Sequence, residues 1–330
     1  MPEQKSENYG EKLPSKFGKR LLLSIIVGLA IFVGLFIYAD IQEVTQAFAE
    51  FRWGYIPLIL ILTLLNYLLR FYKWHYYLRK IGVKIKARDS LGIFLSGLTM
   101  SVTPAKLGEV FKSYLLKRLN GTEISRSAPV VFAERATDVL GLLILAAISF
   151  SAFQYGKEVL VVLIVVPAFL LALIIAMQSR RLGNKLLGIL NSIPLVNRLS
   201  DSLRMTYETF HTLFGFRTLI VATGISVISW GFECLAMYFV LQGFGVSESV
   251  LLSTFVFSFS SVVGAVSMIP GGLIVAEGSF AGLLILAEIS KEIAAGATIL
   301  IRFCTLWFGV VVGLITLFSI KNKLDKRAHV

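Results

Sequence analysis

Long apolar runs, separated by short polar or basic segments, dominate the pattern of this chain. Six of these runs approach or exceed the roughly 20 residues that an α-helix needs to cross a bilayer. They predict spanning helices at about 21–38, 55–72, 127–152, 158–177, 219–242 and 294–320. The sequence therefore predicts an all-α, polytopic membrane protein with about six full transmembrane helices.

Two further apolar segments are too short or too interrupted to span a bilayer. The first, at about 91–103, stops at Pro104, and the second, at about 249–288, is broken at Pro270–Gly272. Proline cannot donate a backbone hydrogen bond, and in hydrocarbon a broken backbone is tolerated only where protein or water covers it. We expect both segments to be broken, re-entrant helices.

The two breaks share a short motif. "SVTPAKLGE" (101–109) and "SMIPGGLIVAE" (267–277) both read Ser-x-x-Pro-x-x-Leu followed by a glutamate. The charges of the flanking loops place the first segment on the cytoplasmic side and the second on the outer side. One broken segment from each face is the pattern of an inverted repeat, although a match this short also arises by chance.

Charge sets the expected orientation of the chain. The sequence has 32 Lys and Arg against 20 Asp and Glu, for a net charge of +12. The basic residues gather in loops beside the spans, and such loops usually lie on the cytoplasmic side of the membrane. This role in orientation explains the positive charge, so no nucleic-acid partner is expected. The prediction is a cytoplasmic tail at 1–20, one integral membrane domain at 21–320 and a second cytoplasmic tail at 321–330.

The basic stretch "RFYKWHYYLRKIGVKIKARD" (70–89) follows the second predicted span. It predicts a cytoplasmic loop with a belt of interfacial aromatic residues, and orientation is favoured over binding of anionic headgroups. The first apolar run ends without a small-residue cleavage site, so it predicts a retained span in the cell membrane.

The sequence contains no pattern typical of a metal site or a catalytic set. His75, His211 and His329 are far apart, and Cys234 and Cys304 both lie in apolar runs. There is no Gly-x-x-x-x-Gly-Lys-[Ser/Thr] motif for ATP and no Asp-x-Asp pair for a metal-dependent transferase. We expect no metal, no cofactor, no catalytic residues and no enzymatic activity.

Charged residues inside the apolar runs are the main candidates for function. Glu134 and Asp138 are four residues apart and share a helix face, while Arg135 lies about 100° round the helix. Each buried charge costs about 2.5–3.5 kcal/mol on insertion scales, so these groups must face the interior. Structural ion pairs that fasten the bundle are the alternative explanation. The same argument covers Lys106, Glu109, Glu233, Glu277 and Arg302.

Three stretches together resemble a known family: "PAKLGEVFKSYLL", "APVVFAERATDVLGLL" and "GAVSMIPGGLIVAEGSF". They look like the transmembrane region of the lysylphosphatidylglycerol synthase family, a flippase-like membrane domain found alone or fused to an aminoacyl transferase domain. The family pattern is Pro-x-x-x-Gly-Glu, Glu-Arg-x-x-Asp and Pro-Gly-Gly-x-Gly-x-x-Glu. The matching positions are Pro104, Gly108, Glu109, Glu134, Arg135, Asp138, Pro270, Gly271, Gly272 and Glu277. The chain departs at Ile274, where the family often has glycine.

The resemblance implies movement of a phospholipid, or of a polyprenyl-linked or other lipid-linked headgroup, between leaflets. We expect four basic residues to hold a phosphate: Lys106, Lys112, Arg135 and Arg302. We expect five carboxylates to hold an amine or carry a proton: Glu109, Glu134, Asp138, Glu233 and Glu277. The helix breaks fall at Pro104, Gly108, Pro270, Gly271 and Gly272.

Other functions stay open. The sequence ends at Val330, so we expect no aminoacyl transferase domain and no aminoacyl transfer. A small-solute or ion secondary transporter would also use inverted broken helices. A non-transporting scaffold for an envelope lipid-modifying enzyme would use the same charges for structure. A second copy of the chain or an envelope lipid-synthesis enzyme is the expected protein partner.

Overall fold

The computed structural model describes residues 37–102, 109–152, 157–181 and 200–327, with some positions between 26 and 34. These residues form helices joined by short turns, and none of them forms a strand. The all-α prediction is confirmed. The first predicted span, 21–38, lies largely outside the described residues.

Four helical segments are long and apolar enough to cross a membrane. They are Trp53–Lys80, Val159–Gln178, Phe216–Gly243 and Lys291–Ile320. These segments correspond to α3 (Ile56–Lys80), α7 (Lys157–Gln178), α11 (Phe216–Gly243), and α14 (Lys291–Arg302) continued by α15 (Phe308–Arg327). The predicted span at 127–152 is α6 (Ile124–Ser149), a helix of similar length that carries four charged residues. The chain is therefore a polytopic helical membrane protein.

The expected loop over 70–80 is wrong, because α3 continues to Lys80. Phe71, Trp74 and Tyr77 recur at helical spacing and pack in a buried cluster with α4 and α6. Their burial extends the helix beyond the apolar run, and it carries Arg70 and Lys73 into the interior. Within the stretch 70–89, only residues 81–86 lie outside a helix.

Both short apolar segments form helices that pack as pairs. The first pair is α4 (Ala87–Leu98) and α5 (Phe111–Asn120), and the second is α12 (Val250–Val266) and α13 (Val275–Leu286). The second pair is joined through η4 (Pro270–Gly272), where Gly271 and Gly272 have φ of 62° and 67°. The predicted break is confirmed there. The first break, with Pro104, Lys106 and Gly108, lies outside the described residues.

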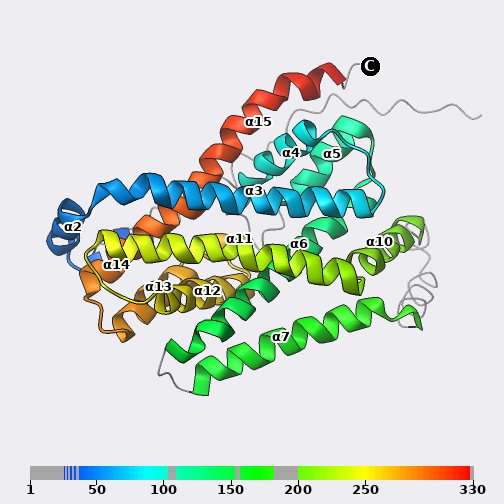
Figure 1. Ribbon diagram of the computed structural model, residues 1–330. Helices are drawn as coiled ribbons and strands as arrows, with labels where there is room; N and C mark the ends of the chain where they lie inside the picture. The colour runs from blue at the N-terminus through cyan, green and yellow to red at the C-terminus, as the bar shows by residue number, and fades with distance from the viewer. Residues whose placement is uncertain are drawn as a thin grey trace, which may run out of the picture.

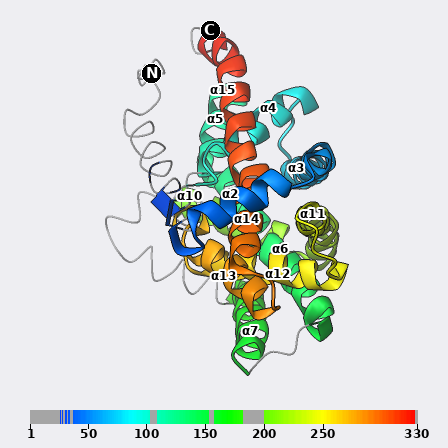
Figure 2. The ribbon, with the colours of Figure 1, turned by 90° about the vertical axis from the view of Figure 1, so that its left-hand side faces the viewer.

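The two halves of the chain have the same helix order and are inverted with respect to each other. α3 and α11 lie side by side and antiparallel, since Arg52 N donates to Gly243 O and Asn66 Nδ2 donates to Ser229 O (Figure 1). Because α4 follows α3 and α12 follows α11, the two short pairs enter the bundle from opposite ends (Figures 1 and 2). Each half also packs on the other's short helix: α6 on α12, and α15 on α4. This is the arrangement of inverted repeats.

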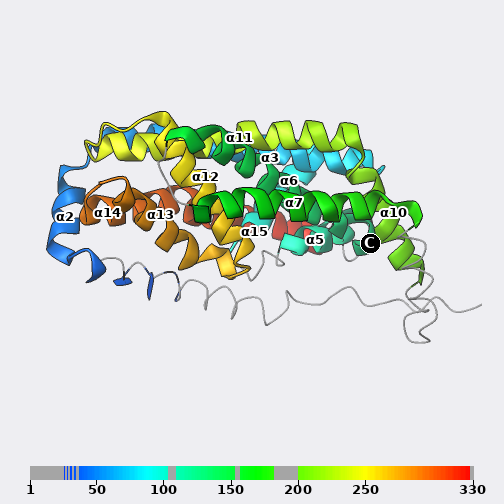
Figure 3. The same cartoon turned by 90° about the horizontal axis from the view of Figure 1, so that it is seen from below.

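The remaining helices lie around this core. α2 (Ile41–Glu50), capped by Asp40, lies across one end of the bundle against α14 (Figure 2). α7 and α10 (Ser200–Leu213) connect the two halves, and α7 lies at the periphery (Figure 3). Only 6% of the apolar window of α7 is buried, so most of its side chains are left for lipid to cover.

Candidate functional site

The first group of buried charges is centred on α6, and we refer to it as the α6 cluster. It comprises the buried Lys73, Glu109, Lys112, Glu134 and Asp138 and the half-buried Arg135, which come from α3, from α5 and the residues just before it, and from α6. Lys112 Nζ lies 2.6 Å from Glu134 Oε2 and 3.6 Å from Glu109 Oε2. The spacing of Glu134 and Asp138 on one helix face is therefore used as predicted, to turn both carboxylates inward.

Arg135 and Lys73 complete the α6 cluster. The Nη2 atom of Arg135 lies 3.0 Å from Asp138 Oδ2 and 3.4 Å from Glu109 Oε2. Lys73 Nζ pairs with Asp138 Oδ1 and donates to Ser226 Oγ of α11 at 2.7 Å. Lys73 and Arg135 thus each lie beside one oxygen of Asp138, so the charge of this buried carboxylate is balanced by two cations.

Small residues let this network form. A Cβ on Gly97 would lie 2.4 Å from Lys112 Cγ, so the Lys112 stem crosses α4 where a glycine leaves room. The Lys112 ammonium then lies 4.6 Å from the centre of the Trp74 ring, a cation–π distance. A Cβ on Gly141 would lie 2.8 Å from Ser226 Cβ, so α11 approaches α6 closely enough to bring Ser226 to Asp138.

The second group of charges, which we call the η4 cluster, is Arg302, Glu277 and the carbonyl of Gly271. Arg302 Nε lies 2.6 Å from Glu277 Oε1, and Arg302 Nη2 donates to Gly271 O at 2.7 Å. Glu277 is buried at the start of α13. One guanidinium therefore ties the broken segment to the last long helix.

The backbone is irregular on both sides of these Arg302 contacts. Arg302 immediately precedes η5 (Phe303–Trp307), a π-helical segment within the last long helix. The Tyr67 hydroxyl donates to Thr305 O there, and Gly309 leaves room for the Tyr67 ring. Ile274 has φ of 72°, which a β-branched residue rarely adopts. That conformation explains why a glycine suits this position of the family pattern.

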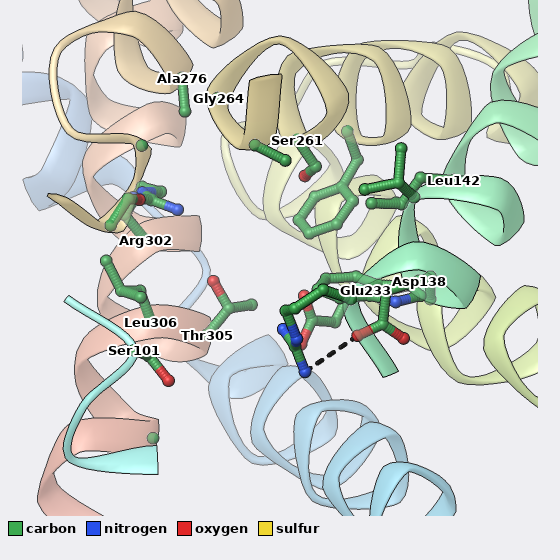
Figure 4. Close-up of a pocket in the computed structure, with 18 of the residues that line it drawn as sticks. Ser101, Asp138, Leu142, Glu233, Ser261, Gly264, Ala276, Arg302, Thr305 and Leu306 are labelled. Atoms are coloured by element: carbon green, nitrogen blue, oxygen red, sulfur yellow. Dashed lines mark hydrogen bonds and ion pairs between the residues drawn. The ribbon is translucent and has the colours of Figure 1, made fainter. Parts of the chain in front are cut away.

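A cavity of about 180 Å³ lies between the two clusters (Figure 4). Three arginines line it, Arg70, Arg135 and Arg302, with Asp138 and Glu233 as the acidic lining residues. Further polar lining comes from four side chains: Tyr67, Ser101, Ser261 and Thr305. The cavity has room for a small polar group, because pockets that hold drug-sized molecules have about 300–1,000 Å³.

The structure brings most of the sequence-predicted residues to this cavity or directly behind it. Arg135, Asp138, Glu233, Gly271, Gly272 and Arg302 line it. Glu109, Lys112, Glu134 and Glu277 stand behind as partners of lining residues or of each other. Pro270 begins η4. Among the described residues, no three His, Cys, Asp or Glu gather into a group that could hold a metal ion.

Sequence reasoning missed Arg70 and Lys73. Both lie in the basic stretch that predicted a loop, although Arg70 lines the cavity and Lys73 belongs to the α6 cluster. The aromatic residues of that stretch, spaced three or four apart, were the signal of a continuing buried helix face.

Comparison with known proteins agrees with the resemblance found in the sequence. Residues 25–313 match the family model described as the lysylphosphatidylglycerol synthase TM region. A UPF0104 membrane protein of Methanocaldococcus jannaschii is 28% identical over 68% of this chain and 95% of its own length. A UPF0104 membrane protein of Methanothermobacter thermautotrophicus is 25% identical over 89% of this chain and 90% of its own length. A third, from Pyrococcus horikoshii, is 24% identical over 89% of this chain and 95% of its own length.

Proposed function

We propose that this chain, which belongs to the lysylphosphatidylglycerol synthase transmembrane-region family, moves a phospholipid or lipid-linked headgroup between membrane leaflets. The observation that carries the proposal is the cavity with three arginines, which is lined by residues of both short helix pairs, among them Leu98 of α4 and Gly264 of α12. A headgroup is polar and needs a shielded route across about 30 Å of hydrocarbon. Two broken segments shorten that route, and the acyl chains stay in the bilayer.

The basic and acidic side chains would bind different parts of the headgroup. Arg135 and Arg302, with Lys112 and Lys106 nearby in the sequence pattern, offer donors to phosphate oxygens, and arginine binds such groups with two parallel hydrogen bonds. The carboxylates Glu109, Glu134, Asp138, Glu233 and Glu277 supply acceptors for an amine or sites for a proton. The cavity holds both types of group within one small volume.

The setting of this activity follows the charge pattern. The proposal places both termini in the cytoplasm, both helix breaks as re-entrant segments, and the protein in the cell membrane, with no enzymatic step of its own. Its partners are a membrane phospholipid or a polyprenyl-linked lipid, and a second copy of the chain or an envelope lipid-synthesis enzyme.

A small-solute or ion transporter is the second candidate, because inverted repeats with broken helices are common in secondary transporters. A scaffold for an envelope enzyme would use the two clusters only as ion pairs. Lipids and tail-free headgroups distinguish the three functions: a flippase requires the tails, a solute carrier transports the headgroup without them, and a scaffold moves neither.

Leaflet transfer in proteoliposomes tests the proposal. Labelled phosphatidylglycerol, lysylphosphatidylglycerol, phosphatidylethanolamine and a polyprenyl phosphate would be compared for the wild type, Glu134→Gln and Glu277→Gln. Glu208→Gln is the matched control, since Glu208 is an exposed glutamate on α10. We expect the wild type to transfer one of these lipids fast. The variants at the two buried glutamates are expected to transfer it at least about tenfold more slowly. Unchanged transfer in both folded variants would reject the proposed route.

A further inference from the structure

Arg70 differs from the other buried cations of this protein. Arg70 lies in the middle of α3, is only 6% exposed, and lines the cavity. Lys73, Lys112, Arg135 and Arg302 each have a carboxylate partner. Within the part of the chain that the structure describes, Arg70 forms no ion pair, and its Nε has no hydrogen-bond partner.

The protein compensates the buried charge of Arg70 only in part. The guanidinium carbon lies 5.3 Å from the centre of the Trp230 ring, a cation–π contact from α11. Asp138, which lines the same cavity, offsets part of this charge without forming an ion pair with Arg70. The buried Nε of Arg70 still has no hydrogen-bond partner, and an anion that enters the cavity would supply an acceptor.

The Arg70 side chain is positioned before any ligand arrives. One turn earlier on α3, Asn66 Nδ2 donates to Ser229 O at 2.8 Å and holds α3 against α11. Trp230, the residue after Ser229, provides the ring below the guanidinium. A fixed guanidinium loses little freedom on binding, and its planar fork matches the oxygens of a phosphate.

The two other arginines of the cavity already have carboxylate partners. Arg135 forms ion pairs with Asp138 and Glu109, and Arg302 donates to Glu277 and to the Gly271 carbonyl. Asp138 and Glu233 also face the cavity and repel an anion that is not held by a cation. Among the described residues, Arg70 is thus the arginine of the cavity that has no carboxylate within ion-pair distance.

We propose that Arg70 receives the phosphate of the headgroup in this cavity, so that the substrates of the protein are phosphate-bearing lipids. This inference rests on the proposed function and makes it narrower. A lipid with the same acyl chains but without phosphate, such as a diacylglycerol, is then a weaker ligand. Free phosphate shares the recognised chemistry, and the test distinguishes the two sources.

Equilibrium binding to the full chain in detergent tests the inference without any transport. Short-chain phosphatidylglycerol, the diacylglycerol of the same chain length, and inorganic phosphate would each be titrated calorimetrically. We expect phosphatidylglycerol to bind at least about tenfold more tightly than the diacylglycerol, which corresponds to one charge-assisted hydrogen-bonded contact. Preference for phosphatidylglycerol over inorganic phosphate assigns the site to a lipid, and the reverse preference assigns it to free phosphate.

Variants connect this binding to Arg70. Arg70→Gln is expected to weaken phosphatidylglycerol about tenfold or more, whereas Arg79→Gln, an exposed arginine of the same helix, leaves it unchanged. Arg70→Lys keeps the buried charge if Arg70→Gln does not fold, and it is expected to lose affinity because lysine has no planar fork. Wild-type affinity in a folded Arg70→Gln or in Arg70→Lys, or equal binding of the diacylglycerol, would overturn the inference.

The two proposals fail in different ways. If phosphatidylglycerol binding depends on Arg70 but no lipid changes leaflet in proteoliposomes, the site stands and the flippase function is rejected. If lipid is transferred and Arg70→Gln transfers and binds it as the wild type does, the flippase function stands and the role of Arg70 is rejected.

Discussion

The two charged clusters that flank the cavity stabilise their surroundings in different ways. In the α6 cluster, Lys112 contacts two carboxylates, and Asp138 is shared by two cations. In the η4 cluster, Arg302 alone holds both Glu277 and the Gly271 carbonyl. The α6 cluster therefore keeps some of its ion pairs when one side chain is removed, whereas the η4 cluster loses all of its contacts when Arg302 is removed.

The backbone around each cluster matches this difference. Most of the α6 cluster projects from α3 and α6, two long helices whose backbone is already hydrogen-bonded. The η4 cluster includes a backbone carbonyl at a break with several residues at positive φ. A break in hydrocarbon needs its free polar groups to be satisfied. The Arg302 guanidinium therefore satisfies a backbone carbonyl at a helix break, and among the described residues none of the contacts named above for the α6 cluster does the same.

The largest expected effect is on the η4 cluster. Arg302→Leu leaves Glu277 buried without its cation and Gly271 O without its donor, which we expect to destabilise the fold by about 3–5 kcal/mol. The double variant Arg302→Leu/Glu277→Leu removes both charges and should recover much of that loss. Thermal unfolding in detergent measures both. A double variant no more stable than Arg302→Leu would mean that the lost carbonyl contact, and not the unpaired charge, dominates.

A smaller effect is expected in the α6 cluster. Gly97→Ala places a methyl group against the Lys112 stem, and we expect a cost of about 1–3 kcal/mol together with weaker pairing to Glu134. Gly224→Ala on α11 is the matched control, because nothing lies within 4 Å of a Cβ there. That control should be neutral or slightly stabilising, since alanine favours a helix. Equal unfolding temperatures for the two variants would contradict the tight crossing at Gly97.

Much of this site could be predicted from the cost of charge in an apolar helix. That cost identified Glu134, Arg135, Asp138, Glu233, Glu277 and Arg302, and the structure buries or half-buries every one of them. The break at Pro270–Gly272 followed from the chemistry of proline and glycine, and it too is present. In these cases a single residue carries a large free-energy cost in an apolar helix, either from its charge or from the break that it causes. Its position in the sequence is therefore informative without any knowledge of its neighbours in space.

The missed features depend on neighbours far along the chain. Lys73 is tolerated in the interior because Asp138 and Ser226, 65 and 153 residues away, meet it there. Without those partners, a basic stretch after an apolar run has the ordinary meaning of a cytoplasmic loop. The π-helical segment at 303–307 likewise has no local signal in the sequence. The hydroxyl that donates to its Thr305 carbonyl belongs to Tyr67 of α3, far away along the chain.

The smallest expected effect concerns the break itself. Ile274→Gly puts at φ 72° a residue that adopts this conformation without steric cost, so we expect stability to rise by about 1 kcal/mol. The Ile274 side chain is 60% exposed, so little packing is lost. The change is measured as the unfolding temperature in detergent. It would sharpen the contrast between the two clusters by showing that the η4 cluster holds a strained backbone in place.

Val275→Gly is the matched control for that change, one residue further on at the first position of α13. Its backbone is helical, so glycine there relieves no strain and should cost about 0.5–1 kcal/mol. The two neighbouring glycine variants are therefore expected to move the unfolding temperature in opposite directions. If both lower it, the positive φ of Ile274 carries no strain, and the role of Arg302 reduces to pairing with Glu277 and Gly271, with no strained turn to restrain.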